Sequence, residues 1–252
     1  MQTHRAMNLI LLDSNETQQK LPAEDRRAEH IRKTLLKAGE RRLYVGIPNG
    51  PMGLAAVELE DDGSVVLNIV WDREIRQEEA YPLTLLVGLS RPQTCRKILR
   101  EAASLGMKEL VFFQSGKGET AYASSSLWTS GEWERQVLEG VEQAFNTHVP
   151  KISHFKSLSD AIRQFAGQEI IGIALDNYEA GIALSEVENR GRPVVLVVGS
   201  ERGFSASERD DLRDSGFTLA HLGSRVLRTE TAVVAGCSVV GAVMGWHQKN
   251  VL

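Results

Sequence analysis

Cysteines are scarce in this sequence and long hydrophobic runs are absent, and each shortage excludes a class of protein. Cys95 and Cys237 are the only two cysteines, and neither has a Cys or His partner at the spacing of metal ligands. This pattern argues against a structural zinc site and against a secreted disulfide scaffold. No run approaches the roughly 18 apolar residues of a membrane span, and residues 1–8 lack the layout of a signal peptide. We therefore expect a cytoplasmic protein with no metal and no membrane partner.

The sequence also lacks an excess of positive charge. Its 29 basic and 33 acidic residues give a formal net charge of −4, so the chain as a whole does not attract nucleic acid. Residues 26–42 are a local exception, because seven Arg or Lys stand there against two Glu. A basic cluster of this kind suits a phosphate backbone, although most charge runs are only solvated faces. Any contact with nucleic acid must therefore come from such a patch.

The hydrophobic pattern changes near residue 77, and we expect a domain boundary there. Before it, short apolar runs predict strands at 8–12, 42–47, 53–59 and 64–70, with one helix at 28–36. On that helix Ala28, Ile31 and Leu35 share one face. Several short strands with one helix favour a small barrel over residues 1–77. The charged stretch 72–81 is interpreted as a linker.

After the linker, apolar strands alternate with helices. Strands are predicted at 83–89, 109–113, 169–175, 193–198 and 217–221, and helices at 92–105, 128–145, 159–165, 205–214 and 229–246. The helix from Ser205 begins with the spacing of a capping box. This alternation is typical of an α/β domain with a parallel sheet covered on both faces.

Parallel sheets bind ligands beyond the carboxyl ends of their strands, and three strand ends here carry unusual sequences. The strand 193–198 runs into Gly199-Ser-Glu-Arg-Gly203, where two glycines let the backbone turn sharply and approach a ligand. The spacing fits neither a dinucleotide fingerprint nor a P-loop. Such a turn can also be no more than a tight connection. After the strand 169–175, Asp176 is expected to cap a turn.

The strand 217–221 leads into Leu222-Gly-Ser-Arg-Val-Leu-Arg-Thr-Glu-Thr-Ala232. Two arginines, a glutamate and two threonines crowd there against an apolar helix, and such side chains are rarely buried unless paired. The alternative is a solvated loop with Thr229 as the helix N-cap and Glu230 in the first turn, where the helix dipole favours it. The density of polar groups favours a site.

These two strand-end motifs resemble those of the 16S ribosomal RNA uracil-N3 methyltransferases, a family of the SPOUT superfamily. The family patterns read approximately G-P-E-G-G-[FL]-S, matched at 199–205, and L-G-x-R-[IV]-L-R-T-E-T-A, matched at 222–232. Residues 27–35 are similar to R-x-x-H-[IL]-x-x-V-L of the family's N-terminal barrel. Glu142-Gln143 followed by Val149-Pro150 is similar to its E-Q and V-P pairs. The resemblance therefore spans the whole chain.

The resemblance implies a fold, a cofactor and partners. Residues 78–252 would form a SPOUT trefoil-knot domain with a parallel sheet, preceded by a PUA-like RNA-binding barrel over residues 1–77. The cofactor would be S-adenosyl-L-methionine (SAM), and the substrate a uridine N3 in 16S rRNA of the small ribosomal subunit. Two copies would form a homodimer through their knotted domains.

The resemblance also assigns residues to the cofactor and to the RNA. For SAM these are Leu175, Val198, Gly199, Glu201, Gly203, Leu222, Gly223, Val226, Leu227, Arg228 and Thr231. For RNA they are Arg26, Arg27, His30, Arg32, Lys33, Lys117 and Arg225.

Methyl transfer to N3 requires alignment of the reacting atoms and loss of the N3 proton. We expect Arg228 to stabilise the resulting anion or to orient the substrate. Glu230 is expected to act as a base or to orient Arg228. An equally good interpretation of Glu230 is a buried ion pair that shapes the fold.

Four positions depart from the family pattern: Ser104, Asn146, Ser200 and Arg202. Three alternatives therefore stay open. The first is a SPOUT enzyme that acts on a ribose 2′-O or a tRNA base. The second is a non-catalytic RNA-binding or ribosome-assembly protein. The third is a nucleotide-binding metabolic enzyme, which would show no salt-sensitive RNA affinity.

Overall fold

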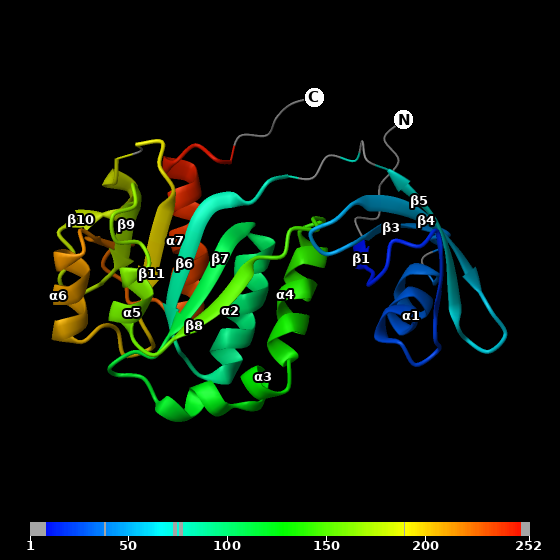
Figure 1. The fold of residues 1–252 in the computed structure, drawn as a ribbon, viewed down its shortest axis with the longest axis horizontal. Helices are drawn as coiled ribbons and strands as arrows, with labels where there is room; N and C mark the ends of the chain where they lie inside the picture. Colours follow the sequence, from blue (N-terminus) through cyan, green and yellow to red (C-terminus); the bar gives the residue numbers. More distant parts are fainter. Residues whose placement is uncertain (1–8, 38, 73–74, 76–77, 189, 248–252) are drawn as a thin grey trace. The chain divides into compact units, whose positions relative to one another are not determined.

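The computed structural model describes residues 9–37, 39–72, 75, 78–188 and 190–247, which form two compact units (Figure 1). The first unit is Met1–Glu79 with Val141–Val149, and the second is Ala80–Gly140 with Pro150–Leu252. The segment Val141–Val149 thus belongs to the first unit, although the residues before and after it in the sequence belong to the second. Its membership was not expected from the sequence.

The first unit is a five-stranded sheet in the order β1-β3-β4-β5-β2 with one helix against it. Its strands are β1 (Leu9–Leu11), β2 (Gln18–Leu21), β3 (Arg42–Gly46), β4 (Met52–Leu59) and β5 (Val65–Asp72). Four of them confirm the predicted strands. β2 was missed because it is a polar edge strand in which only Leu21 is buried.

The helix of the first unit begins two residues earlier than predicted. It consists of α1 (Arg26–His30), which continues as a π-helical turn, η1 (Ile31–Leu35). The face formed by Ala28, Ile31 and Leu35 is buried, as predicted, and packs into the core of the unit. This apolar contact leaves the basic residues Arg26, His30 and Lys33 of the helix exposed.

The segment Val141–Val149 is fastened to the first unit by polar side chains. Glu142 accepts a hydrogen bond from the Leu11 amide at 3.0 Å. Asn146 donates to the carbonyl of Glu78 at 2.9 Å, and its own carbonyl oxygen accepts from two following amides. The asparagine thus closes a turn, which gives this departure from the family pattern a structural role.

The second unit contains a seven-stranded sheet in the order β10-β12-β9-β11-β6-β7-β8, and every pair of neighbours is parallel. Its strands are β6 (Tyr81–Gly88), β7 (Met107–Phe113), β8 (Lys151–Phe155), β9 (Ile171–Leu175), β10 (Ile182–Ala183), β11 (Val194–Val198) and β12 (Thr218–His221). The central strand β11 is buried along its whole length, as expected for a sheet covered on both faces. The parallel α/β fold is therefore confirmed. The short edge strands β8 and β10 were missed.

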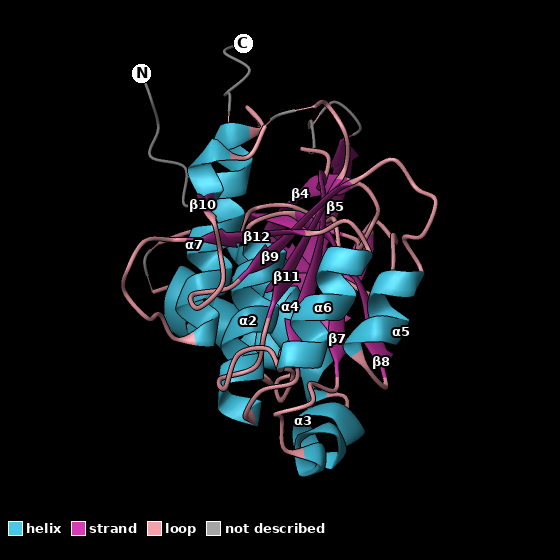
Figure 2. Cartoon of the chain, turned by 90° about the vertical axis from the view of Figure 1, so that its left-hand side faces the viewer, coloured by secondary structure: helices cyan, strands magenta, loops and turns pink. Residues whose placement is uncertain are grey.

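Helices cover both faces of this sheet (Figure 2). The helices after β6 are α2 (Pro92–Ser104), η2 (Thr120–Ser124), α3 (Ser126–Thr129), α4 (Glu132–Gln143), α5 (Leu158–Arg163), η3 (Leu184–Glu186), α6 (Ala206–Asp214) and α7 (Thr229–Val243). α2, α4 and α7 lie on one face, and α5 and α6 on the other. Among the described residues, no helix combines the length and apolar character needed to cross a bilayer.

Two helix predictions are decided by local geometry. The single helix predicted at 128–145 is wrong, because Gly131 with φ of 75° separates α3 from α4. The capping box is confirmed: the Ser205 hydroxyl accepts from the Glu208 amide, and the Glu208 carboxylate accepts from the Ser205 amide.

The linker predicted at 72–81 is too long, since Asp72 ends β5 and Tyr81 begins β6. Four of its positions, 73, 74, 76 and 77, lie outside the described residues.

Candidate active site

A cleft of about 670 Å³ lies in the second unit at the carboxyl ends of β9, β11 and β12. These strands are neighbours in the sheet, so the loops that follow them meet at one edge. The first turns of α2, which follows β6, complete the wall. The two sequence motifs at 199–203 and 222–228, separated by about twenty residues, therefore face the same space, as the strand pattern predicted.

Most of the residues singled out from the sequence line this cleft. They are Leu175, Val198, Gly199, Glu201, Gly203, Leu222, Val226, Leu227, Arg228 and Glu230. Gly223, Arg225 and Thr231 are exposed neighbours that do not contribute to the lining. Lys117 is also exposed, in the loop after β7, and lies outside the lining.

The glycine-rich turn packs on the end of β6 through backbone alone. Gly203, with φ of 66°, donates its amide proton to the Ser200 carbonyl at 2.8 Å and closes the turn. A Cβ on Gly88, the last residue of β6, would lie 2.5 Å from the Ser200 nitrogen. A Cβ on Gly199 would lie 3.1 Å from the Gly203 carbonyl carbon. Without a Cβ on Gly88 the turn lies close to the strand, and without one on Gly199 the turn closes tightly on Gly203, so that its backbone lines the cleft.

The side chains of this turn have structural partners of their own. Glu201 accepts a hydrogen bond from the Arg91 amide at 2.9 Å, so it caps the beginning of α2. Arg202 forms an exposed ion pair with Glu119 at 3.1 Å. Ser200 is buried. Ser200 and Arg202 are the two residues of this turn that depart from the family pattern. The first is thus buried, and the second forms an ion pair at the surface.

The loop after β12 turns sharply into α7. Gly223 adopts φ of 100°, and its amide donates to the His221 Nδ1 at 3.1 Å. The proposed N-cap at Thr229 is wrong by one residue, because Arg228 holds the cap position and the buried Thr229 begins the helix. Arg228, at the cap position, is one of the residues that line the cleft.

Glu230, in the first turn of α7, is paired with a residue that the sequence interpretation missed. Lys97 of α2 lies 3.1 Å from its carboxylate. A hydrogen bond from its own backbone amide lowers the pKa of Glu230, and Lys97 and Arg228 act in the same direction, against the opposing effect of burial. A carboxylate held in its ionised form is a weak base.

Arg228 is the contrasting case in this cleft. Its side chain is exposed, and within the described part of the chain its guanidinium group has neither a hydrogen bond nor an ion pair. The positive charge is thus available to a bound molecule.

Asp176 caps the loop after β9, as predicted, and does more than that. One carboxylate oxygen accepts from the amides of Tyr178 and Glu179 at 2.8 and 2.6 Å. The other accepts from Arg209 of α6 at 2.8 Å, and both side chains of this ion pair are buried. The pair fixes the loop that forms one lip of the cleft.

Several lining residues have no counterpart among the sequence predictions. They are Arg91, Gln93, Thr94 and Lys97 of the α2 region and Asn177 and Tyr178 of the β9 loop. A signal for the first group was present. The helix predicted to begin at Pro92 directly follows a parallel strand, so its first turns had to lie at the carboxyl edge of the sheet.

The basic cluster of the first unit is only partly open to a partner. Arg27 is bonded to Asp25 and Asp13 at 2.9 and 3.0 Å, and Arg32 donates to the Ala23 carbonyl at 2.7 Å. These guanidinium groups hold their own unit together. Lys33 pairs with Glu29. The exposed members of the cluster are Arg26, His30, Lys33, Lys37, Arg41 and Arg42.

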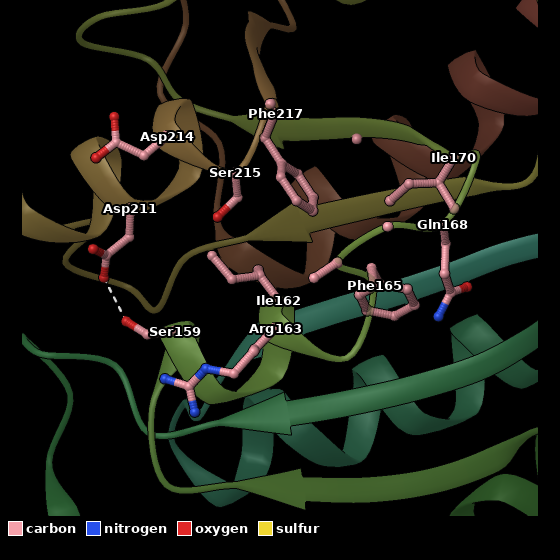
Figure 3. Close-up of a pocket in the computed structure, with 14 residues that line it drawn as sticks. Ser159, Ile162, Arg163, Phe165, Gln168, Ile170, Asp211, Asp214, Ser215 and Phe217 are labelled. Atoms are coloured by element: carbon pink, nitrogen blue, oxygen red, sulfur yellow. Dashed lines mark hydrogen bonds between the residues drawn. The ribbon is translucent and has the colours of Figure 1, made fainter.

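A second pocket of about 510 Å³ lies at the opposite edge of the sheet (Figure 3). It is formed between α5, α6 and the amino ends of β9 and β12, over apolar side chains that include Ile162, Phe165 and Phe217. At its rim Ser159 donates a hydrogen bond to Asp211. None of the sequence motifs reaches this pocket. In the parts of the chain that the structure describes, no group of three His, Cys, Asp or Glu could hold a metal ion.

The fold and the cleft together define an α/β protein with a candidate ligand site built from loops at the carboxyl edge of a parallel sheet. Residues 77–241 match the family described as the RNA methyltransferase domain. The match covers well over half of the chain, and the chain belongs to this family.

Relatives of similar length support the assignment. The Ribosomal RNA small subunit methyltransferase E of Treponema pallidum is 32% identical over 256 residues, covering 96% of this chain and 94% of the relative. The Ribosomal RNA small subunit methyltransferase E 1 of Borreliella burgdorferi is 27% identical, covering 94% and 98%. A crystal structure of the corresponding Neisseria gonorrhoeae enzyme bound to S-adenosyl methionine shares the fold, with a TM-score of 0.76 at 20% identity over 94% of this chain and 98% of that one.

The buried ion pair beneath the β9 loop generates a stability prediction. Replacing Asp176 by Asn removes the buried countercharge of Arg209 and leaves it only the more exposed Glu179, 3.4 Å away, so we expect the free energy of unfolding to fall by about 3 kcal/mol. Urea denaturation followed by circular dichroism measures this change. The matched control is Asp210→Asn, which removes an exposed partner of Arg213 and should cost less than about 0.5 kcal/mol. Equal effects of the two substitutions would contradict the assigned role of the pair.

Proposed function

We propose that this protein is a SAM-dependent methyltransferase that acts on 16S rRNA of the small ribosomal subunit, at N3 of a uridine. The observation that carries the proposal is the convergence of the 199–203 turn and the 222–228 loop on one cleft. Membership of the RNA methyltransferase family supports the reaction class. The names of the full-length relatives support the small-subunit rRNA as substrate.

The residues of the cleft suit SAM. Its volume lies within the range of roughly 300–1,000 Å³ typical of small-molecule sites. The backbone around Gly199 and Gly203 approaches without side chains, and Leu175, Val198 and Leu227 supply apolar lining. The Neisseria gonorrhoeae structure that shares this fold contains the same molecule. When bound, SAM supplies a methyl group activated by its sulfonium.

The residues of the cleft must prepare the uridine N3 to receive the methyl group. Arg228, which has no ion-pair partner among the described residues, is placed to hold a uracil carbonyl oxygen and to stabilise the anion that forms when the N3 proton leaves to water. Glu230 keeps its negative charge and pairs with Lys97. We therefore assign to Glu230 the positioning of Lys97 and Arg228 rather than removal of the proton.

The proposal includes a homodimer formed through the C-terminal domain, working in the cytoplasm where ribosomal subunits are present. α7 is apolar on nearly all sides, and a helix of this kind is ordinarily buried. It packs against α2, β11 and η3, but Thr231 and Ala242 on its outer side stay exposed in the single chain. A second copy would cover that side. The threading of α7 through a loop, as in a trefoil knot, stays a prediction.

The reaction is tested by incubating purified small ribosomal subunits with the protein and SAM and mapping methylated fragments by mass spectrometry. We expect one methyl group on a uridine base. Arg228→Ala should lower turnover by roughly 10²–10³-fold, because it removes a stabilising charge from the transition state. The control Arg190→Ala, in an exposed pair with Glu188, should leave turnover unchanged. A methyl group on a ribose, or full activity of Arg228→Ala, would contradict the mechanism.

The basic cluster of the first unit is proposed to bind the rRNA backbone. Replacing the exposed Lys37, Arg41 and Arg42 by Gln should weaken RNA binding and flatten its dependence on salt by up to about one logarithmic unit per lost phosphate contact. SAM affinity should not change. Filter binding over a series of salt concentrations measures the slope. Lys20→Gln, which removes the partner of Glu60, is the control, and an unaltered slope in the triple variant would refute the assignment.

A further inference from the structure

We infer that Tyr178 is a stacking platform for a nucleobase of the RNA substrate at the mouth of the cleft. The inference rests on the proposed function, and it adds a substrate-binding residue that neither motif of the sequence contains. Three observations carry it: the exposure of the ring, the way the ring is held, and its position beside the glycine turn.

The Tyr178 side chain is exposed to an unusual extent for a large aromatic residue. Its relative exposure is 75%, and it is the one aromatic among the four exposed large hydrophobic residues of the described chain. Leu59 and Val70 belong to the first unit, whereas Val226 and Tyr178 both line the cleft. An exposed π-face at a cleft mouth is a ready surface for a base, and stacking of this kind tolerates any base sequence.

The ring is held in place from below by charged groups. The guanidinium carbon of Arg209 lies 5.6 Å from the centroid of the Tyr178 ring, within cation–π range. Arg209 is in turn fixed by Asp176, which also accepts a hydrogen bond from the Tyr178 amide. A buried ion pair thus sets both the backbone and the ring of one exposed residue. A preorganised ring loses little conformational entropy when a base stacks on it.

The position of the ring favours the RNA over the cofactor. A Cβ added to Gly203 would lie 3.9 Å from the ring carbon Cε2, so the ring edge stands beside the glycine turn at the outer part of the cleft. The apolar strand ends of Leu175 and Val198 offer the adenosyl group a more enclosed surface. An RNA base must reach the methyl group from outside, and single-stranded bases are commonly received on aromatic side chains.

The test compares Tyr178→Leu with Tyr178→Phe in the full-length protein, using small ribosomal subunits as substrate. Leu keeps an apolar side chain without a π-face, whereas Phe keeps the π-face without the hydroxyl group. We expect Leu to raise KM for the RNA by about tenfold and Phe to restore it, since base stacking is worth on the order of a tenfold effect or more. The dissociation constant of SAM, measured by calorimetry, should be the same in all three proteins.

Two results would overturn the inference. One is an unchanged KM in Tyr178→Leu, and the other is an equal loss of SAM affinity, which would place the adenine rather than an RNA base on the ring. A wild-type protein that binds SAM but methylates no RNA would count against the proposed function instead. In that case, binding of a uridine-containing oligonucleotide to the Leu and Phe variants still decides the stacking role, because only the Leu variant should bind it more weakly.

Discussion

The close approach of two backbone segments, the end of β6 and the turn 199–203, is the contact on which the candidate site depends. It exists because Gly88 presents no Cβ at the contact, while the missing Cβ of Gly199 lets the turn close on Gly203. The parallel order β12-β9-β11-β6 then places the loops of three strands and the first turns of α2 around one space. A ligand in that space meets backbone groups of the turn, so its binding is tied to the geometry of the sheet rather than to flexible side chains.

Electrostatic arrangement gives the cleft its chemical character. Glu201 is bonded to the beginning of α2, Glu230 to Lys97, and Asp176 to Arg209. With these carboxylates engaged by the protein, the Arg228 guanidinium has no partner among the described residues, and in the proposed mechanism it faces the substrate. Charges that are fixed before the substrate arrives need no reorganisation during the reaction, which is how preorganised sites stabilise an anion. The buried ion pair between Asp176 and Arg209 likewise lies beneath Tyr178 at the lip of the cleft.

The pattern of apolar strands and glycine turns was sufficient to predict the parallel sheet and the edge at which the site lies. Short or polar edge strands such as β2 and β8 escaped prediction because few of their side chains are buried, so little periodicity is visible. Lys97 was missed because it sits one helical turn inside α2, far in sequence from Glu230, and only tertiary packing brings the two together. For the same reason no local pattern indicated that Asn146 and its neighbours join the first unit. Arg27 and Arg32, which are predicted to bind RNA, also bond within their own unit, and charge in a sequence does not show which guanidinium groups have such internal partners.

The central claim is that the close packing of the glycine turn on β6 forms the SAM site, and calorimetric titration of SAM into Gly88→Ala tests it most directly. A Cβ at this position would lie 2.5 Å from the Ser200 nitrogen and must displace the turn. Gly181→Ala is the matched control, since a Cβ there meets no atom within 4 Å. The account predicts SAM binding at least about tenfold weaker in Gly88→Ala, a loss on the order of 1.4 kcal/mol, with both variants folded and the control unchanged. SAM affinity equal to that of the wild type in a folded Gly88→Ala protein would contradict it.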